Sequence, residues 1–179
     1  FPGVIVPRKT VAELVKTLDI GDVVVSVSDT KIKFDMGAVT IVSKVIDGTF
    51  PDYTRVIPTA NNNHITANSA ELKQAADRVA TVADDRARAV KIEVADGIAK
   101  LTTRGNGANL AEDEVAVTYS GPALDWGVNS KYFAEILNQC NGQDVTLECG
   151  NSDAPILVRP CDDINAVYVV MPMRLQIND

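Results

Sequence analysis

The chain has 179 residues, 46% of them hydrophobic, which is enough to build one domain or slightly more. Its 17 lysine and arginine residues are outnumbered by 24 aspartate and glutamate residues, which gives a net charge of -7. This charge excludes a protein whose whole surface attracts nucleic acid or anionic membranes. A local basic stripe on one face is still compatible with it. No apolar run reaches the roughly 18 residues of a membrane span. The spacing of Cys140, Cys149 and Cys161 fits neither a disulfide framework nor a tetrahedral zinc site. We therefore expect reduced thiols in a cytoplasmic protein.

The beginning of the chain predicts one helix followed by three strands. Val11, Leu14, Val15 and Leu18 recur at the spacing of an amphipathic helix. After Gly21 the pattern becomes that of β-structure. Strands are expected at residues 23–27, 31–34 and 39–45.

A connector is predicted at residues 50–58. Pro51 and Pro58 interrupt regular structure, because proline lacks a backbone donor and restricts the residue before it. Phe50 and Tyr53 are nevertheless too apolar for a free linker. We therefore expect this segment to be packed down between two structural units.

The rest of the chain predicts a longer mixture of strands and helices. Asn68 followed by Glu71 resembles a helix-capping arrangement ahead of an apolar stripe at residues 72–83. A third helix is expected at residues 133–140. Strands are expected near residue 65 and at 90–94, 98–103, 115–119, 124–128, 145–148, 156–158 and 166–171.

The first and third predicted helices share one sequence pattern. Residues 9–18 match residues 131–140 at a constant spacing of 122 positions. A repeat of this length is domain-sized. We therefore predict an α+β fold with one complete domain at residues 59–179, preceded by the last half of a similar domain at residues 1–58.

No catalytic constellation is evident in the sequence. His64 is the only histidine and lies in an asparagine-rich stretch expected to be a loop, and there is no G-x-S-x-G nucleophile motif. Acidic clusters at residues 84–85, 112–114 and 162–163 have the chemistry to hold a hard cation, although a solvated helix end or loop is the ordinary explanation. These clusters leave a small cytosolic metal-dependent enzyme as the alternative function.

Two features allow either a binding function or a purely structural one. Cations on the polar sides of the helices suit contact with a DNA backbone, or they pair with neighbouring carboxylates on a solvated face. The C-terminal stretch containing Met171, Pro172 and Met173 predicts an edge strand that either forms an adaptable groove for peptides or closes the core. The helix cations are Arg8, Lys9, Lys16, Lys73, Arg78 and Lys131.

Four stretches, in order and in spacing, resemble the bacterial β sliding clamps, the processivity subunits of the replicative DNA polymerase. They are VIVPRK at 4–9, DGTFPDYTRVIP at 47–58, VTYSG at 117–121 and YVVMPMRL at 168–175. The resemblance covers the second half of that family's middle domain and all of its C-terminal domain. It implies a DNA-clamp fold, with antiparallel sheets on the outer face of a ring and two helices per complete domain on the inner face.

The resemblance also implies a non-enzymatic accessory subunit of the polymerase, with no cofactor and no metal. The family's full-length protein is a homodimer that encircles duplex DNA without reading its sequence. Arg8 and Lys9 match the family's DNA-contacting pair in the middle domain, and the resemblance places Lys73, Arg78 and Lys131 on DNA-lining helices by position alone. The dimer interface would include Thr81, Val82, Glu112 and Asp113.

The family recruits the polymerase, the clamp loader and repair polymerases through a pocket that binds short linear motifs. The resemblance implies that the apolar part of this pocket accepts a leucine or phenylalanine of the client peptide, with Arg174 near its polar end. Pro155 stands where the family often has a small polar residue. The corresponding residues here are Pro51, Arg55, Val56, Asn129, Tyr132, Pro155, Val169, Val170, Met171, Pro172, Met173 and Arg174.

Overall fold

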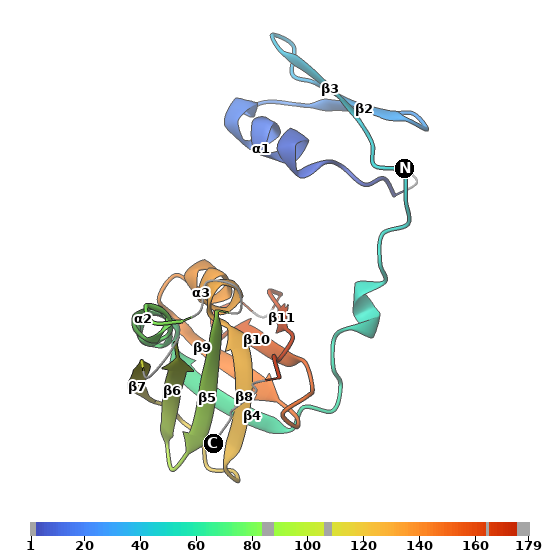
Figure 1. Cartoon of the computed structure of the whole chain (residues 1–179). Helices are drawn as coiled ribbons and strands as arrows, with labels where there is room; N and C mark the ends of the chain where they lie inside the picture. The colour runs from blue at the N-terminus through green and yellow to red at the C-terminus, as the bar shows by residue number, and fades with distance from the viewer. Residues whose placement is uncertain (1–2, 84–87, 106–108, 164, 175–179) are drawn as a thin grey trace. The chain divides into compact units, whose positions relative to one another are not determined.

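The computed structural model describes residues 3–83, 88–105, 109–163 and 165–174. They form two compact units, Phe1–Asp52 and Tyr53–Asp179, each with its own fold (Figure 1). Both units combine helices with antiparallel sheets, so the predicted α+β class is confirmed. Within the described residues, none of the helices has the length and apolarity that a membrane crossing requires.

The first unit contains one helix and one three-stranded sheet, as the periodicity predicts. Helix α1 (Arg8–Thr17) precedes strands β1 (Val24–Val27), β2 (Lys31–Asp35) and β3 (Thr40–Lys44), which pair in the order β1-β2-β3. The hydroxyls of Thr10 and Ser43 lie 2.7 Å apart and join the helix to the sheet.

The apolar stripe of α1 is only partly buried. Leu14 is 8% exposed, whereas Val11, Val15 and Leu18 are 47%, 73% and 47% exposed. The amphipathic pattern therefore predicts the helix correctly, but three of its four apolar positions stay largely exposed among the described residues.

The second unit is built from two four-stranded antiparallel sheets and two helices that pack against each other (Figure 1). The sheets have the orders β11-β10-β9-β4 and β7-β6-β5-β8. The elements are a short 3-10 helix η1 (Tyr53–Arg55), β4 (Asn63–Asn68), α2 (Ser69–Ala80), β5 (Ala89–Ala95), β6 (Ile98–Arg104), β7 (Leu110–Ala116), β8 (Leu124–Asn129), α3 (Ser130–Gln139), β9 (Asp144–Cys149), β10 (Ile156–Pro160) and β11 (Tyr168–Val170).

Two details differ from the sequence-based expectations. β7 begins at Leu110 rather than near residue 115, because its acidic residues pair with cations instead of ending the strand: Glu112 lies 2.8 Å from Lys100. His64 lies on β4 and not in a loop. The connector was expected to be packed down between two units; Phe50 and Tyr53 are 66% and 63% exposed, and their packing between the units stays a prediction.

The three helices begin at Arg8, Ser69 and Ser130, at a constant spacing of 61 residues. Each is preceded by an extended segment that forms an isolated bridge to the end of its own half: Ile5 to Ile46, Thr66 to Thr118, and Gly127 to Met173. In each bridge the later residue donates its N–H to the earlier carbonyl at 2.8–2.9 Å. The repeating element is thus a β-α-β-β-β half-domain, and the 122-residue spacing found in the sequence spans two of them.

The two half-domains of the second unit exchange their first strands. β4, which precedes α2, pairs with β9, and β8, which precedes α3, pairs with β5. Each sheet therefore contains strands from both halves. The core beneath the helices draws on both halves as well, with Leu72, Val90, Val128, Phe133 and Leu147 all at most 2% exposed.

Both helices of the second unit begin at an asparagine N-cap. The Asn68 side chain accepts the N–H groups of Ala70 and Glu71 at 3.1 and 3.2 Å, as the capping pattern predicts, and its amide donates to the Gly142 carbonyl at 2.9 Å. The Asn129 side chain likewise accepts the N–H groups of Lys131 and Tyr132. These caps satisfy donors that a helix start otherwise leaves unpaired.

We expect Asn68→Ala to lower the free energy of unfolding of the second unit by about 1–2 kcal/mol, because it removes the cap and leaves the Gly142 carbonyl without this donor. Trp126 is the only tryptophan and is 5% exposed on β8, so its fluorescence during urea denaturation reports this unit alone. Asn138→Ala, at an exposed position of α3, is the matched control. Equal unfolding midpoints for the two variants would contradict the capping role.

Candidate functional site

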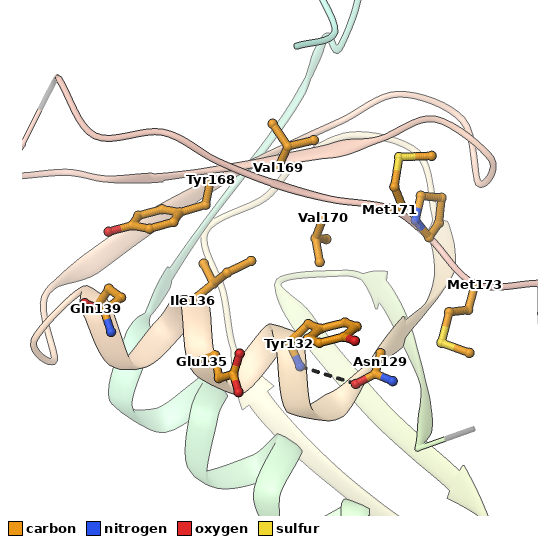
Figure 2. A pocket seen from close by; sticks show the side chains of 11 residues that line it. Asn129, Tyr132, Glu135, Ile136, Gln139, Tyr168, Val169, Val170, Met171 and Met173 are labelled. Atoms are coloured by element: carbon orange, nitrogen blue, oxygen red, sulfur yellow. Dashed lines mark hydrogen bonds between the residues drawn. The ribbon is translucent and has the colours of Figure 1, made fainter. Parts of the chain in front are cut away.

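An open groove of about 780 Å³ lies between α3 and the C-terminal segment of the second unit. Figure 2 shows Tyr132 and Ile136 pointing from the helix toward β11, and Val170 pointing back toward the helix. Most of the lining is apolar, with Asn129, Glu135 and Gln139 as its polar members. The lining residues are Asn129, Tyr132, Glu135, Ile136, Gln139, Tyr168, Val169, Val170, Met171, Pro172 and Met173.

The C-terminal segment forms one wall because β11 is the edge strand of its sheet. Val170 pairs with Ile156 and is 5% exposed, so its neighbour Val169 points to the other face. Pro172 offers no N–H for a further ladder. Beyond it, Met173 donates its N–H to the Gly127 carbonyl at 2.8 Å and returns the chain to β8.

The groove leaves large apolar groups accessible to solvent. Tyr132 is 60% exposed and Met171 is 61% exposed, while Ile136 and Met173 are half-buried. Methionine and tyrosine present wide, adaptable apolar contact area. Such a surface suits a small number of apolar anchor residues from a partner.

Seven of the twelve residues predicted for peptide binding line this groove. They are Asn129, Tyr132, Val169, Val170, Met171, Pro172 and Met173. The last strand both closes the core and borders the groove, because Val170 is 5% exposed and also belongs to the lining, while a peptide-binding role of the groove stays a prediction.

The other five predicted residues lie outside the lining. Arg174 directly follows Met173, and its guanidinium Nε lies 3.7 Å from a carboxylate oxygen of Asp153. The Pro155 carbonyl accepts a hydrogen bond from the Asn61 amide at 2.8 Å. Arg55 ends η1 and Val56 follows it, whereas Pro51 belongs to the first unit.

Sequence reasoning missed Glu135, Ile136, Gln139 and Tyr168. The three helical residues could have been found, because they follow Tyr132 at i+3, i+4 and i+7 and so share its helix face. The signal for Tyr168 is weaker: it lies two residues before Val170 on the same strand, so the two side chains share one face.

A second, smaller groove of about 350 Å³ runs between α2 and α3. It contains Lys73 and Lys131, two of the predicted DNA-contacting cations, together with Arg88, which the sequence analysis did not propose. The Lys73 ammonium lies 2.8 Å from the Asp77 carboxylate, so the i, i+4 pairing expected from the sequence also occurs.

Arg78 lies apart from this groove. Its Nε donates to the Asp113 carboxylate at 2.6 Å, which ties the end of α2 to β7. This hydrogen bond holds the pKa of Asp113 below its ordinary value. The Thr81 hydroxyl donates to the Arg78 carbonyl at 2.7 Å, so this predicted interface residue adjoins the same ion pair. Thr81 and Val82 follow α2 directly, while Glu112 and Asp113 lie on β7.

Arg8 and Lys9 are exposed in the first turn of α1, and Lys131 is exposed in the first turn of α3. The start of a helix carries a partial positive charge, so cations there do not stabilise the helix. Residues that break a local rule in this way are candidates for binding.

Among residues 3–83, 88–105, 109–163 and 165–174, no group of three His, Cys, Asp or Glu side chains is arranged to bind a metal. Glu112 and Asp113 are engaged with Lys100 and Arg78, and the acidic pair at 84–85 lies outside the described residues. The three thiols are free, and burial raises the pKa of Cys149 to about 12, which keeps it protonated and inert.

Two family models match the chain. Residues 54–174 match the C-terminal domain of the DNA polymerase III beta subunit, and residues 2–52 match its central domain.

Individual proteins are similar over the same span. The beta sliding clamp of Caulobacter vibrioides is 40% identical over 177 residues, which are 98% of this chain and 48% of that protein. The Escherichia coli K12 beta sliding clamp is 36% identical over 175 residues, 97% of this chain and 48% of that protein. The crystal structure of a Bartonella birtlesii DnaN sliding clamp bound to griselimycin superposes with a TM-score of 0.91 at 42% identity, over 98% of this chain and 48% of that one. The chain thus spans about half the length of these relatives.

The Arg78–Asp113 pair predicts a specific acid dependence of stability. Because the folded-state pKa of Asp113 lies below the ordinary 3.8, the pair stabilises the fold above that pH and loses its contribution as the pH falls through the lowered value. Asp113→Asn should therefore reduce stability at neutral pH, and the difference from the unchanged protein should vanish in acid.

Trp126 fluorescence during urea denaturation across a pH series measures this difference. Glu114→Gln alters a neighbouring exposed carboxylate of β7 as the control. A deficit of Asp113→Asn that stays constant down to strongly acidic pH would argue against the pair.

Proposed function

The chain belongs to the family of DNA polymerase III β subunits, the bacterial β sliding clamps, and we propose that it serves DNA replication as part of a processivity clamp that encircles duplex DNA. In this role it is a non-enzymatic accessory subunit of the polymerase, acting in the cytoplasm. Two family-model matches that together run from residue 2 to residue 174 are the main support.

The proposed organisation is half of the clamp's middle domain with its connector, residues 1–58, followed by the complete C-terminal domain, residues 59–179. The half-domain repeat supports it, since the second unit contains two β-α-β-β-β halves and the first unit one such helix with its following strands. In the full-length protein, two such subunits would close a homodimeric ring, with Thr81, Val82, Glu112 and Asp113 at the interface.

DNA would be held by enclosure, with weak and sequence-independent contacts from the helices. Lys73 and Lys131 lie together in the groove between α2 and α3 and support this, as do Arg8 and Lys9 on the first turn of α1. Few phosphate contacts suit a ring that must slide, since each one strengthens and localises binding. Arg78 contributes less in this proposal, because Asp113 already occupies its Nε.

The groove beside α3 is the proposed docking site for short linear motifs of the polymerase, the clamp loader and repair polymerases. Its accessible apolar wall of Tyr132, Ile136, Met171 and Met173 supports this role more than any other feature of the second unit. A leucine or phenylalanine of the client would supply the anchor, and the exposed Arg174 would meet the polar end of the peptide. Affinity should be modest, because few anchors offset the ordering of a flexible peptide.

Peptide binding should depend on the exposed groove residues. We expect Tyr132→Ser and Met171→Ser each to weaken a Gln-Leu-x-Leu-Phe-type peptide by about tenfold or more, because each removes an accessible apolar contact. Isothermal titration calorimetry measures the affinity. Ile98→Ser changes an apolar residue that is 44% exposed and not in the groove lining, and it should leave the affinity unchanged. Deleting residues 171–174 should abolish binding, and retained affinity after that deletion would refute the groove as the docking site.

DNA contact should depend on the helix cations and on salt. Lys73→Ala combined with Lys131→Ala should reduce the salt dependence of weak duplex binding, with the slope of log affinity against log salt falling by about one per lost phosphate contact. Fluorescence anisotropy with a labelled duplex at low ionic strength measures it. Lys31→Ala with Lys44→Ala, on neighbouring strands of the first unit, removes the same charge away from the helices. Equal losses for both double variants would indicate a net-charge effect only.

In a full-length clamp, Arg8→Ala with Lys9→Ala should likewise weaken salt-sensitive DNA contact, because these exposed cations begin α1. The same anisotropy titration at low salt measures the change, and an unaltered curve would count against both residues.

A further inference from the structure

The groove beside α3 has a charged side chain in an otherwise uncharged wall. Of the described residues that line it, Glu135 is the one with a formal charge at neutral pH, and it is exposed. Gln139 is exposed as well and follows four residues later in α3. Side chains at this spacing are neighbours on one face of a helix. The wall therefore presents a carboxylate and an amide carbonyl as adjacent hydrogen-bond acceptors.

This polar pair occupies a defined place along the groove. Figure 2 shows Met173 toward the start of α3 and Tyr168 toward its end. Glu135 and Gln139 lie about 4.5 and 10 Å beyond Tyr132 along the helix axis, at a rise of about 1.5 Å per residue. An extended peptide advances about 3.3 Å per residue. A client residue one to three positions from an anchor at Tyr132 therefore reaches the pair.

The cations nearest to Glu135 in the sequence and in the fold do not neutralise it. Glu135 also lines the smaller groove between α2 and α3, where the Lys73 ammonium lies 2.8 Å from the Asp77 carboxylate and is already paired. Lys131 stands four residues before Glu135, and a lysine that precedes its glutamate is the less favourable order for such a pair. Among the described residues, no ion pair involves Glu135. Its carboxylate is thus available to a cation from a partner.

We propose that Glu135 makes the groove selective for client peptides that carry a basic residue, arginine in preference to lysine, one to three positions from the apolar anchor. A planar guanidinium donates to the Glu135 carboxylate and the Gln139 carbonyl together, and Tyr168 offers an aromatic face at the same end of the groove. An ammonium is a point charge and matches two fixed acceptors less well. The inference rests on the proposed function, because it assigns a specificity to the same docking site.

The selectivity should be modest and sensitive to salt. Glu135 is exposed, so water and dissolved ions screen its attraction for the charge on the client. Exposed ion pairs change an equilibrium constant by about two- to fivefold. The apolar anchors therefore supply most of the affinity, and Glu135 discriminates among clients that share those anchors.

Isothermal titration calorimetry with three peptides of equal length tests this selectivity. Each contains a Gln-Leu-x-Leu-Phe-type motif between two short flanks: the first peptide has neutral flanks, the second has an arginine in the leading flank, and the third has an arginine in the trailing flank. One of the two arginine peptides should bind the complete 179-residue chain about two- to fivefold more tightly than the neutral peptide at low salt. This advantage should shrink at about 0.5 M salt. Lysine in place of that arginine should retain only part of it.

Substitutions on the chain identify the carboxylate. Glu135→Gln should remove the advantage, so that the arginine and neutral peptides bind alike, and Glu135→Lys should reverse it. Glu114→Gln is the matched control, because it removes an exposed carboxylate from β7, outside the groove lining, and changes the net charge by the same amount. This control should keep the advantage of the arginine peptide.

Equal affinities of all three peptides for the unchanged chain would overturn the inference and leave the groove as an unselective docking site. An advantage that survives Glu135→Gln, or that Glu114→Gln also removes, would overturn it too, because another residue or the net charge would then be responsible. Equal binding of the lysine and arginine peptides would refute the two-acceptor contact. A neutral peptide that fails to bind would instead refute the proposed docking function, and the selectivity with it.

Discussion

The fold depends on the exchange of one strand between two half-domains. A single β-α-β-β-β half has one helix and an apolar stripe on it, but its own strands cover only part of that stripe. In the second unit, the pairing of β4 with β9 and of β8 with β5 brings a second sheet and a second helix over each stripe. Phe133 and Leu72 are then at most 1% exposed. In the first unit the same helix position, Val11, remains 47% exposed because no second half is present in the described residues.

The groove beside α3 is a consequence of the same topology. The exchange leaves β11 at the outer edge of its sheet, where Pro172 prevents any further ladder and the chain turns back to Gly127. The exposed side of α3 then meets the last residues of the chain across an open apolar surface. Asn129 serves both features, since it caps α3 and contributes to the groove wall, so the start of the helix and the shape of the groove are mechanically linked.

Positive and negative side chains are distributed differently over the helices and the strands. The net charge of -7 coexists with cations on helix surfaces because the carboxylates are placed largely on strands and loops. On β7, acidic residues pair with Lys100 and Arg78 and strengthen the strand that a charge run would ordinarily weaken. Arg78 is thereby tied to the sheet, whereas Lys73 and Lys131 are gathered in the groove between the helices.

Local sequence signals determined the elements of this protein. Apolar periodicity located all three helices, the Asn68 pattern gave the start of α2, and the match of Lys9 with Lys131 exposed the duplication. The stretch around Met171 indicated a groove, and four short motifs indicated the family. Each of these signals lies within a short stretch of sequence or in a direct match between two stretches, so it can be recognised from the sequence alone.

Only the tertiary structure decided which apolar faces are covered and which side chains meet. The wall formed by Ile136 and Gln139, the pairing of Arg78 with Asp113, and the strand character of residues 110–114 all depend on partners distant in the sequence. Val15 and Leu137 occupy the same position in the repeat, yet one is 73% and the other 1% exposed. Among the described residues, the second unit has an exchanged half-domain over this helix position and the first unit does not, so burial of that kind depends on strand pairing and not on the helix that carries the residue.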